Sequence, residues 1–163
     1  MRSSVRIGQR IPAAHLAYLD AAGDLRTVHT ESYFAGCKAL VIGVPGAFTP
    51  VCTHQHLPPF LEKAAQFRKG GYTKLVCLSA GDPYSTAVWA TQIDPHRNLT
   101  FLSDGNLDFT RAAGFSSVET SLFLGERSQR YVMALTNAIV TGLRIEQSVL
   151  QVTCTGADEV LLD

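Results

Sequence analysis

The apolar run at residues 39–44, with the sequence Ala-Leu-Val-Ile-Gly-Val, is the feature that most constrains the fold. A run this short and continuous is typical of a strand buried on both faces of a parallel sheet. Thr49 and Pro50 follow within a few residues, and threonine is a good helix N-cap while proline suits the first helical position. We therefore expect a buried strand that leads directly into a helix.

Strand and helix patterns continue to alternate along the chain. Short apolar runs bounded by turn residues predict strands, and apolar residues at helical spacing predict helices. The predicted strands cover residues 15–19, 25–29, 39–44, 73–79, 100–103, 130–135 and 138–145, and the predicted helices cover 31–35, 50–69, 83–93, 107–112 and a segment opened by Gly156 and Asp158. The first two strands form a hairpin, and the alternation favours an α/β fold with a mixed central sheet flanked by helices.

The composition predicts a single domain over residues 1–163. The chain is 46% apolar, and no linker rich in proline, glycine and serine divides it. Fourteen basic and fourteen acidic residues cancel, which removes the electrostatic case for binding nucleic acid or anionic membranes. The apolar runs are too short to span a membrane, and residues 1–6 lack the apolar core of a secretory signal, so we expect a cytoplasmic protein.

Cys52 occupies the third position of the helix that is predicted to begin at Pro50. The first backbone N–H groups of a helix have no intrahelical acceptor, and together with the positive end of the helix dipole they stabilise a thiolate. This position therefore predicts a reactive cysteine. The alternative is an inert buried thiol, the usual state of a lone free cysteine, and the cap position argues against it.

The sequence predicts neither a metal site nor a cofactor. The cysteines at positions 37, 52, 77 and 154 lack the C-x-x-C spacing of a redox dithiol or a zinc ribbon. His54 and His56 follow Cys52 at intervals of two residues, and residues two apart on a helix point away from each other. We expect His54 to be a solvated residue of the first turn.

The pattern P-x-x-x-T-x-x-C at residues 45–52 resembles the active-site motif of the peroxiredoxins, which are thiol enzymes that reduce hydroperoxides. Residues 43–50 are similar to the type II, or peroxiredoxin-5-like, branch. Further similar segments are His-Leu-Pro at 56–58, Cys-Leu-Ser at 77–79, Asp-Pro-Tyr at 82–84 with Trp89, and the arginine segment at 125–131. The resemblance runs in the family's order from about Gly8 to the C-terminus, and it implies a thioredoxin-like fold. It also places His56 where the family has a histidine, which implies a hydrogen bond that fixes the helix.

The resemblance also implies a reaction and the residues that perform it. A Cys52 thiolate attacks a hydroperoxide, either hydrogen peroxide or an alkyl hydroperoxide, and becomes a sulfenic acid. Thr49 would supply a hydroxyl to the peroxide and the sulfur, Pro45 would shield the pocket, and Arg130 would hold the thiolate and the peroxide oxygens. A surface ion pair is the alternative reading of Arg130, and Arg127 is the second candidate for its role.

Pro58 and Pro59 lie inside the predicted cysteine helix. A proline in a helix interior removes a backbone hydrogen bond and clashes with the preceding turn. The two residues either only curve the helix around the core or weaken the turns that carry Cys52. The second reading fits the resembling enzymes, which unwind this turn during their cycle.

Three routes are open for resolving the sulfenic acid. We prefer Cys154, which lies in a polar stretch that we expect to be mobile and exposed, over Cys77 in its apolar strand or an external thiol. The resemblance implies thioredoxin, or glutaredoxin with glutathione, as the reductant. It also implies a homodimer that packs through exposed apolar residues near the site, with Phe48, Leu78 and Pro83 as candidates.

A redox-inactive thioredoxin-like binding or chaperone module is the rival class, because a fold does not determine a function. The loss of Pro45, Thr49, Cys52 or Arg130 would favour that class. All four residues are present, so the sequence favours a thiol peroxidase that serves antioxidant defence.

Overall fold

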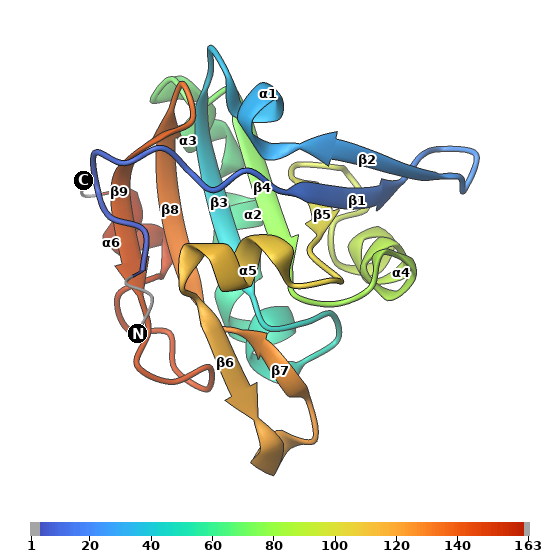
Figure 1. Cartoon of the computed structure of the whole chain (residues 1–163). Coiled ribbons are helices and arrows are strands. Elements are labelled where there is room, and N and C mark those ends of the chain that lie inside the picture. The colour runs from blue at the N-terminus through green and yellow to red at the C-terminus, as the bar shows by residue number, and fades with distance from the viewer. Residues whose placement is uncertain (1–3, 162–163) are drawn as a thin grey trace.

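The computed structural model describes residues 4–161 (Figure 1). Residues 1–3 and 162–163 of the predicted domain lie outside it, including half of the N-terminal stretch that is predicted to carry no secretory signal. Over the described residues the chain forms a seven-stranded sheet in the order β2-β1-β5-β4-β3-β8-β9. Its strands are β1 (His15–Leu19), β2 (Leu25–His29), β3 (Lys38–Val44), β4 (Lys74–Ser79), β5 (Thr100–Ser103), β8 (Tyr131–Thr136) and β9 (Ile139–Ile145).

The sheet is mixed, as the sequence predicts. β3 pairs in parallel with β4 and antiparallel with β8, and β4 pairs in parallel with β5. β1 and β2 form the predicted N-terminal hairpin, which joins the edge of the sheet through β5. The predicted strands therefore all exist within one or two residues of their expected bounds.

Helices cover both faces of the sheet (Figure 1). They are α1 (Thr30–Phe34), the π-helical turn η1 (Cys52–His56), α2 (Leu57–Glu62), α3 (Ala64–Lys69), α4 (Pro83–Ile93), α5 (Asp108–Ala113), the 3-10 turn η2 (Thr120–Leu122) and α6 (Ala157–Leu161). Side chains of β3 alternate between two buried clusters: Val41 packs with Phe109 of α5, and Ile42 packs with Phe60 of α2 and Trp89 of α4. Within residues 4–161, no helix is long and apolar enough to cross a membrane.

The cysteine helix differs from the single helix predicted over residues 50–69. It begins at Pro50 as expected, but it widens into the π-helical turn η1 and breaks again at Lys63 between α2 and α3. Pro58 and Pro59 have no N–H group, so the carbonyls four residues earlier receive no helical hydrogen bond. The backbone instead closes a wider turn in which the Leu57 N–H donates to the Cys52 carbonyl.

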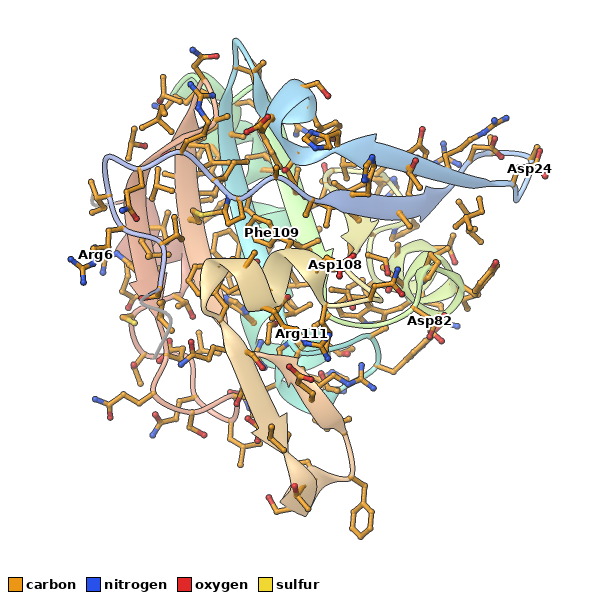
Figure 2. All side chains as sticks on the ribbon, viewed as in Figure 1. Arg6, Asp24, Asp82, Asp108, Phe109 and Arg111 are labelled. Carbon is orange, nitrogen blue, oxygen red and sulfur yellow. The ribbon has the colours of Figure 1, made fainter. Side chains whose placement is uncertain are left out.

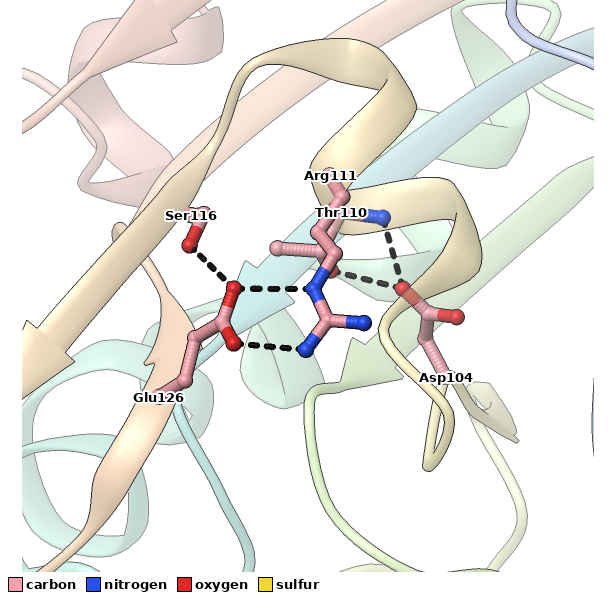
Figure 3. A network of polar contacts seen from close by, with 5 residues as sticks. All are labelled: Asp104, Thr110, Arg111, Ser116 and Glu126. Atoms are coloured by element: carbon pink, nitrogen blue, oxygen red, sulfur yellow. Dashed lines mark hydrogen bonds and ion pairs between the residues drawn. The ribbon is translucent and has the colours of Figure 1, made fainter.

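A two-stranded ribbon, β6 (Ser116–Glu119) and β7 (Gly125–Ser128), projects from the body of the molecule and was not predicted (Figure 1). Glu126 of the ribbon accepts two hydrogen bonds from Arg111 of α5, from Nε at 2.9 Å and Nη2 at 2.6 Å, and a third from Ser116 (Figure 3). Arg111 lies on the side of α5 that faces the ribbon, whereas Phe109 is buried against the sheet (Figure 2). Short polar strands carry little hydrophobic periodicity, which is why the pattern missed them.

The ribbon and β3 together fix the start of β8. The Ser128 hydroxyl donates to the Val44 carbonyl at 3.2 Å, and Tyr131 pairs with Gly43 across the ladder. A Cβ atom on Gly43 would lie 2.0 Å from the Tyr131 ring, so only glycine fits there. Arg130, immediately before β8, is therefore held beside the end of β3 from which the cysteine loop departs.

Candidate active site

Cys52 is fully buried at the start of η1, and its sulfur has two polar partners. The Thr49 Oγ1 lies 2.7 Å from the Cys52 Sγ, and the Arg130 Nη2 lies 3.3 Å from it. Thr49 also opens the helix, since its carbonyl accepts from the Thr53 N–H. The Thr49 hydroxyl has one proton and lies 2.9 Å from the Gly46 carbonyl as well, so it donates to the sulfur only in competition with that carbonyl.

Arg130 is 1% exposed, so it is not a surface ion pair. Its Nε and Nη2 donate to the Val149 carbonyl at 3.1 and 2.8 Å, and its Nη1 lies 2.9 Å from the His56 Nδ1. None of the ion pairs found among the described residues involves Arg130. Its positive charge therefore faces the Cys52 sulfur without a direct carboxylate partner.

His56 is fully buried and links Arg130 to the C-terminal segment. A guanidinium has only donors, so the His56 Nδ1 accepts from Arg130 and the proton resides on Nε2, which donates to the Thr155 carbonyl at 3.0 Å. Burial, reinforced by the nearby charge of Arg130, lowers the pKa of His56 to about 3. A neutral imidazole thus orients the arginine.

A mostly apolar cavity of about 200 Å³ reaches this site. Its lining residues are Pro45, Thr49, Pro50, Val51, Leu122, Leu124, Arg130, Val149 and Leu150. The cavity therefore gives a small molecule access to two polar side chains, Thr49 and Arg130, that also contact the cysteine sulfur. Apolar walls exclude water and strengthen electrostatic interactions inside such a site.

Arg127 holds the loops around the cavity and makes no hydrogen bond to Cys52 among the contacts of residues 4–161. Its Nη1 lies 3.4 Å from the Pro45 carbonyl and 3.3 Å from the Ala80 carbonyl, and its Nε donates to the Leu124 carbonyl at 2.8 Å. These bonds join the loops that follow β3 and β4 to the β6–β7 ribbon. Arg127 is a scaffold for the loop that contains Pro45.

The other cysteines occupy different environments, and all four thiols are free. Cys77 is fully buried in β4 in the same apolar cluster as Cys52, and burial raises its pKa well above the usual value. Cys154 is half-buried, and its thiol donates weakly to the Ile145 carbonyl at 3.5 Å. Burial and the nearby Glu146 carboxylate raise the pKa of Cys154. Cys37 lies in the turn between α1 and β3, and its thiol donates weakly to the Phe34 carbonyl at 3.4 Å.

Sequence reasoning missed the segment at residues 146–155, whose backbone completes the site through the carbonyls of Val149 and Thr155. It also missed Glu146, a buried carboxylate that binds the backbone around Cys154. The available signal was a single acidic residue at the end of an apolar strand, followed by threonines on both sides of Cys154. In the part of the chain that the structure describes, no group of three or more His, Cys, Asp or Glu residues could hold a metal ion.

Comparison with known proteins identifies relatives over almost the entire chain. The family model described as Redoxin matches residues 6–161. Peroxiredoxin-2C of Oryza sativa subsp. japonica is 34% identical over 157 residues, covering 96% of each chain, and Peroxiredoxin-2B of Arabidopsis thaliana is 31% identical with the same coverage.

Solved structures agree with this result. The reduced Prx3 of Vibrio vulnificus in complex with H2O2 has a TM-score of 0.89 and 31% identity, covering 97% of this chain and 94% of that one. Peroxiredoxin 5 of Alvinella pompejana has a TM-score of 0.83 and 25% identity, covering 97% and 96%. The thioredoxin-like fold expected from the sequence is thereby confirmed. The chain belongs to the Redoxin family and is a type II peroxiredoxin, a thiol-dependent peroxide reductase whose peroxidatic residue is Cys52 beside Arg130.

Proposed function

We propose that this peroxidase reduces hydrogen peroxide and alkyl hydroperoxides with Thr49, Arg130 and Pro45 as the residues that assist Cys52. The observation that carries the proposal is the pair of donors on the Cys52 sulfur, 2.7 Å from Thr49 and 3.3 Å from Arg130, at a cavity that both residues line. The thiolate attacks the terminal peroxide oxygen, so an S–O bond forms and the O–O bond breaks. The hydroxide or alkoxide leaves and takes up a proton, and the sulfur becomes a sulfenic acid.

Negative charge moves from the sulfur to the peroxide oxygens during this step, so a donor that serves both positions lowers the barrier. Arg130 suits this task because its planar group has several donors. Its contacts with Val149 and His56 fix its orientation in advance. Thr49 can turn its hydroxyl from Gly46 toward the sulfur or the peroxide. Pro45 lines the cavity without adding an N–H that could compete for the peroxide.

The test is a single turnover with one equivalent of hydrogen peroxide, followed by trapping of the sulfenic acid. The wild-type protein should consume the peroxide, and Cys52→Ser should consume none, because a serine hydroxyl does not ionise near neutral pH. Cys37→Ser is the control and should match the wild type. A wild-type protein that leaves peroxide untouched would instead favour the redox-inactive binding or chaperone module.

We further propose that Cys154 resolves the sulfenic acid. Its thiolate would attack the Cys52 sulfur, forming an S–S bond and breaking the S–O bond, and the departing hydroxide would take up the proton lost by Cys154 to give water. Two observations support this choice: Cys154 is half-buried, and its segment already hydrogen-bonds to Arg130 and His56. Cys77 is locked in the central sheet, where attack would require β4 to leave its ladder.

Peptide mapping under non-reducing conditions tests the resolving thiol. One equivalent of peroxide should give a Cys52–Cys154 bridge, and Cys154→Ser should keep a normal first turnover but lose cycling with thioredoxin as the reductant. A Cys52–Cys77 peptide, or unimpaired cycling in Cys154→Ser, would contradict the assignment. Replacing thioredoxin by glutaredoxin with glutathione in the same assay identifies the reductant.

The remaining proposals concern assembly and location. We propose a single domain over the full chain, supported by strands from residues 15 to 145 in one sheet, and a cytoplasmic location, supported by the free thiols.

We also propose a homodimer through the face that carries Phe48, which is 50% exposed, and the half-buried Pro83. The expected contribution of Leu78 is wrong, because its side chain points into the core and is 4% exposed. Sedimentation at micromolar concentration tests the dimer.

A further inference from the structure

The segment at residues 146–155 is anchored around a single carboxylate. Glu146 is 2% exposed, and its Oε1 accepts from the backbone N–H groups of Thr153, Cys154 and Thr155 at 2.6, 2.9 and 3.0 Å. The hydroxyls of Thr153 and Thr155 add bonds of 2.7 and 2.9 Å. Burial alone would raise the pKa of Glu146, but the threonine hydrogen bonds outweigh it and lower the pKa to about 2. We call these contacts the Glu146 clamp.

The clamp fixes the backbone of Cys154 and of the residues on both sides of it. In the clamped state the Cys154 thiol bonds to the Ile145 carbonyl, while the Cys52 sulfur bonds to Thr49 and Arg130. A disulfide needs an S–S distance of about 2 Å and Cβ atoms about 4 Å apart. Cys52 is fully buried under these partners, so the bridge requires one or both backbones to move. Charge-assisted bonds to a buried carboxylate oppose that movement on the Cys154 side.

The clamp is also connected to the cysteine turn. His56 belongs to η1, and it donates to the carbonyl of Thr155, whose own N–H is held by Glu146. The Glu146 N–H in turn donates to the Arg130 carbonyl at 2.9 Å. Unwinding of η1 would withdraw His56 from Thr155 and would leave the clamp as the remaining restraint on the Cys154 segment.

We propose that Glu146 is a positioning residue that gates the resolving step: while its carboxylate holds the amides of residues 153–155, Cys154 cannot reach the Cys52 sulfenic acid. This inference rests on the proposed resolving role of Cys154. The clamp lengthens the life of the sulfenic acid, so a second peroxide has more time to oxidise the Cys52 sulfur to sulfinic acid. Glu146 thereby sets the sensitivity of the enzyme to overoxidation.

Glu146→Gln tests the gate because the amide keeps the shape and one acceptor oxygen but removes the charge. The rate of formation of the Cys52–Cys154 bridge, followed by rapid quenching and mass spectrometry, should rise about tenfold, since bonds to a neutral acceptor are roughly half as strong. The yield of sulfinic acid at high peroxide should fall in parallel. Alkylation of Cys154 should shift to lower pH, because the Glu146 carboxylate helps to raise the pKa of this thiol and the substitution removes that charge.

Two further variants make the test specific. Thr153→Val removes one hydroxyl from the clamp at an exposed position and should accelerate bridge formation to a smaller extent. Asp24→Asn changes the same charge at the tip of the β1–β2 hairpin, away from the site, and should change nothing (Figure 2). Circular dichroism checks that each variant is folded.

The outcomes separate the gate from the resolving role. If the wild type forms the Cys52–Cys154 bridge and folded Glu146→Gln forms it at an equal or lower rate, the resolving role stands and the gate is overturned. If the wild type forms no such bridge, both proposals fail together. Faster bridge formation in Glu146→Gln and Thr153→Val, with less sulfinic acid, supports the gate.

Discussion

Cys52 and Cys154 are the same chemical group in opposite electrostatic environments. Cys52 faces a guanidinium and a hydroxyl donor, whereas Cys154 is attached to a segment that wraps around a buried carboxylate. Burial and the nearby Glu146 carboxylate raise the pKa of Cys154, whereas the polar partners of Cys52 are both hydrogen-bond donors. Under the proposed cycle, the folded protein presents Cys52 to the peroxide and keeps Cys154 bound until the resolving step.

The two regions also differ in the movement that each needs. The Cys52 site is complete in the folded state, with Arg130 fixed by Val149 and His56. Under the proposed gate, the Cys154 segment leaves Glu146 before Cys154 reacts. The peroxide step should thus depend on the rigid contacts, and the resolving step on how readily those contacts open. Variants on each side of the site separate these dependencies.

Arg130→Met should produce the largest effect. The variant loses the charged donor at 3.3 Å from the Cys52 sulfur, and loss of one such preorganised donor typically slows a reaction by about 10²–10³-fold. Arg127→Met is the matched control, since Arg127 bonds to the carbonyls of Pro45 and Ala80 rather than to the sulfur. Stopped-flow measurement of the peroxide step should show less than a tenfold loss for the control. The reverse order would exchange the two roles.

The Cys52 half of the site could be predicted because its determinants are local. Thr49 precedes the helix, Pro50 begins it and Cys52 carries the thiol, all within four positions, and threonine and proline have strong preferences for these places. Only the family resemblance identifies Arg130 from the sequence, because no periodicity shows that an arginine is buried. Its surroundings arise from β8, the ribbon and the C-terminal segment, which are brought together only by the fold.

The C-terminal half could not be predicted for the same reason. A polar stretch near a chain end is usually mobile and exposed, and the sequence predicts this for Cys154. Instead Glu146 supplies a buried acceptor for several consecutive amides, which replaces the missing secondary structure. The sequence shows the threonines and the glutamate, but it does not show that the chain turns back upon the carboxylate.

Acidification should weaken the connection between the two regions through His56. The pKa of His56 is about 3 in the folded protein and about 6.5 in an unfolded chain. Between pH 3 and pH 6.5, the unfolded chain therefore carries a proton on this imidazole and the folded protein does not. The contribution of the neutral His56 side chain to the free energy of unfolding is complete above pH 6.5, and it is lost as the pH falls from 6.5 toward 3. From pH 7 to pH 5 the free energy of unfolding should decrease by about 2 kcal/mol from this group.

Urea unfolding at pH 7, 6 and 5 measures this loss, with His56→Asn as the comparison. That variant should show a smaller decrease over the same range. The window avoids the carboxylates Glu126 and Glu146, whose pKa values of about 2 matter only at lower pH. Equal pH dependence in the two proteins would show that His56 is not the group that titrates.

Pro58→Ala should have the smallest effect and should act on the Cys52 side alone. The new N–H can donate to the carbonyl of His54, which converts the π-helical turn toward an ordinary helix and makes η1 harder to unwind. We expect the peroxide step to change less than the resolving step, and bridge formation to slow by roughly three- to tenfold, corresponding to about one backbone hydrogen bond. Pro95→Ala, at an exposed turn after α4, is the control for losing a proline elsewhere.

Combining Pro58→Ala with Glu146→Gln then compares the two regions directly. If unwinding of η1 and release of the clamp both limit the bridge, slowing the first and accelerating the second should return the rate of bridge formation toward the wild-type value. If the double variant is as slow as Pro58→Ala alone, unwinding precedes release and the clamp opens only afterward. If bridge formation in Pro58→Ala is faster than in the wild type, the prolines do not weaken the Cys52 turn and serve only to curve the helix over the core.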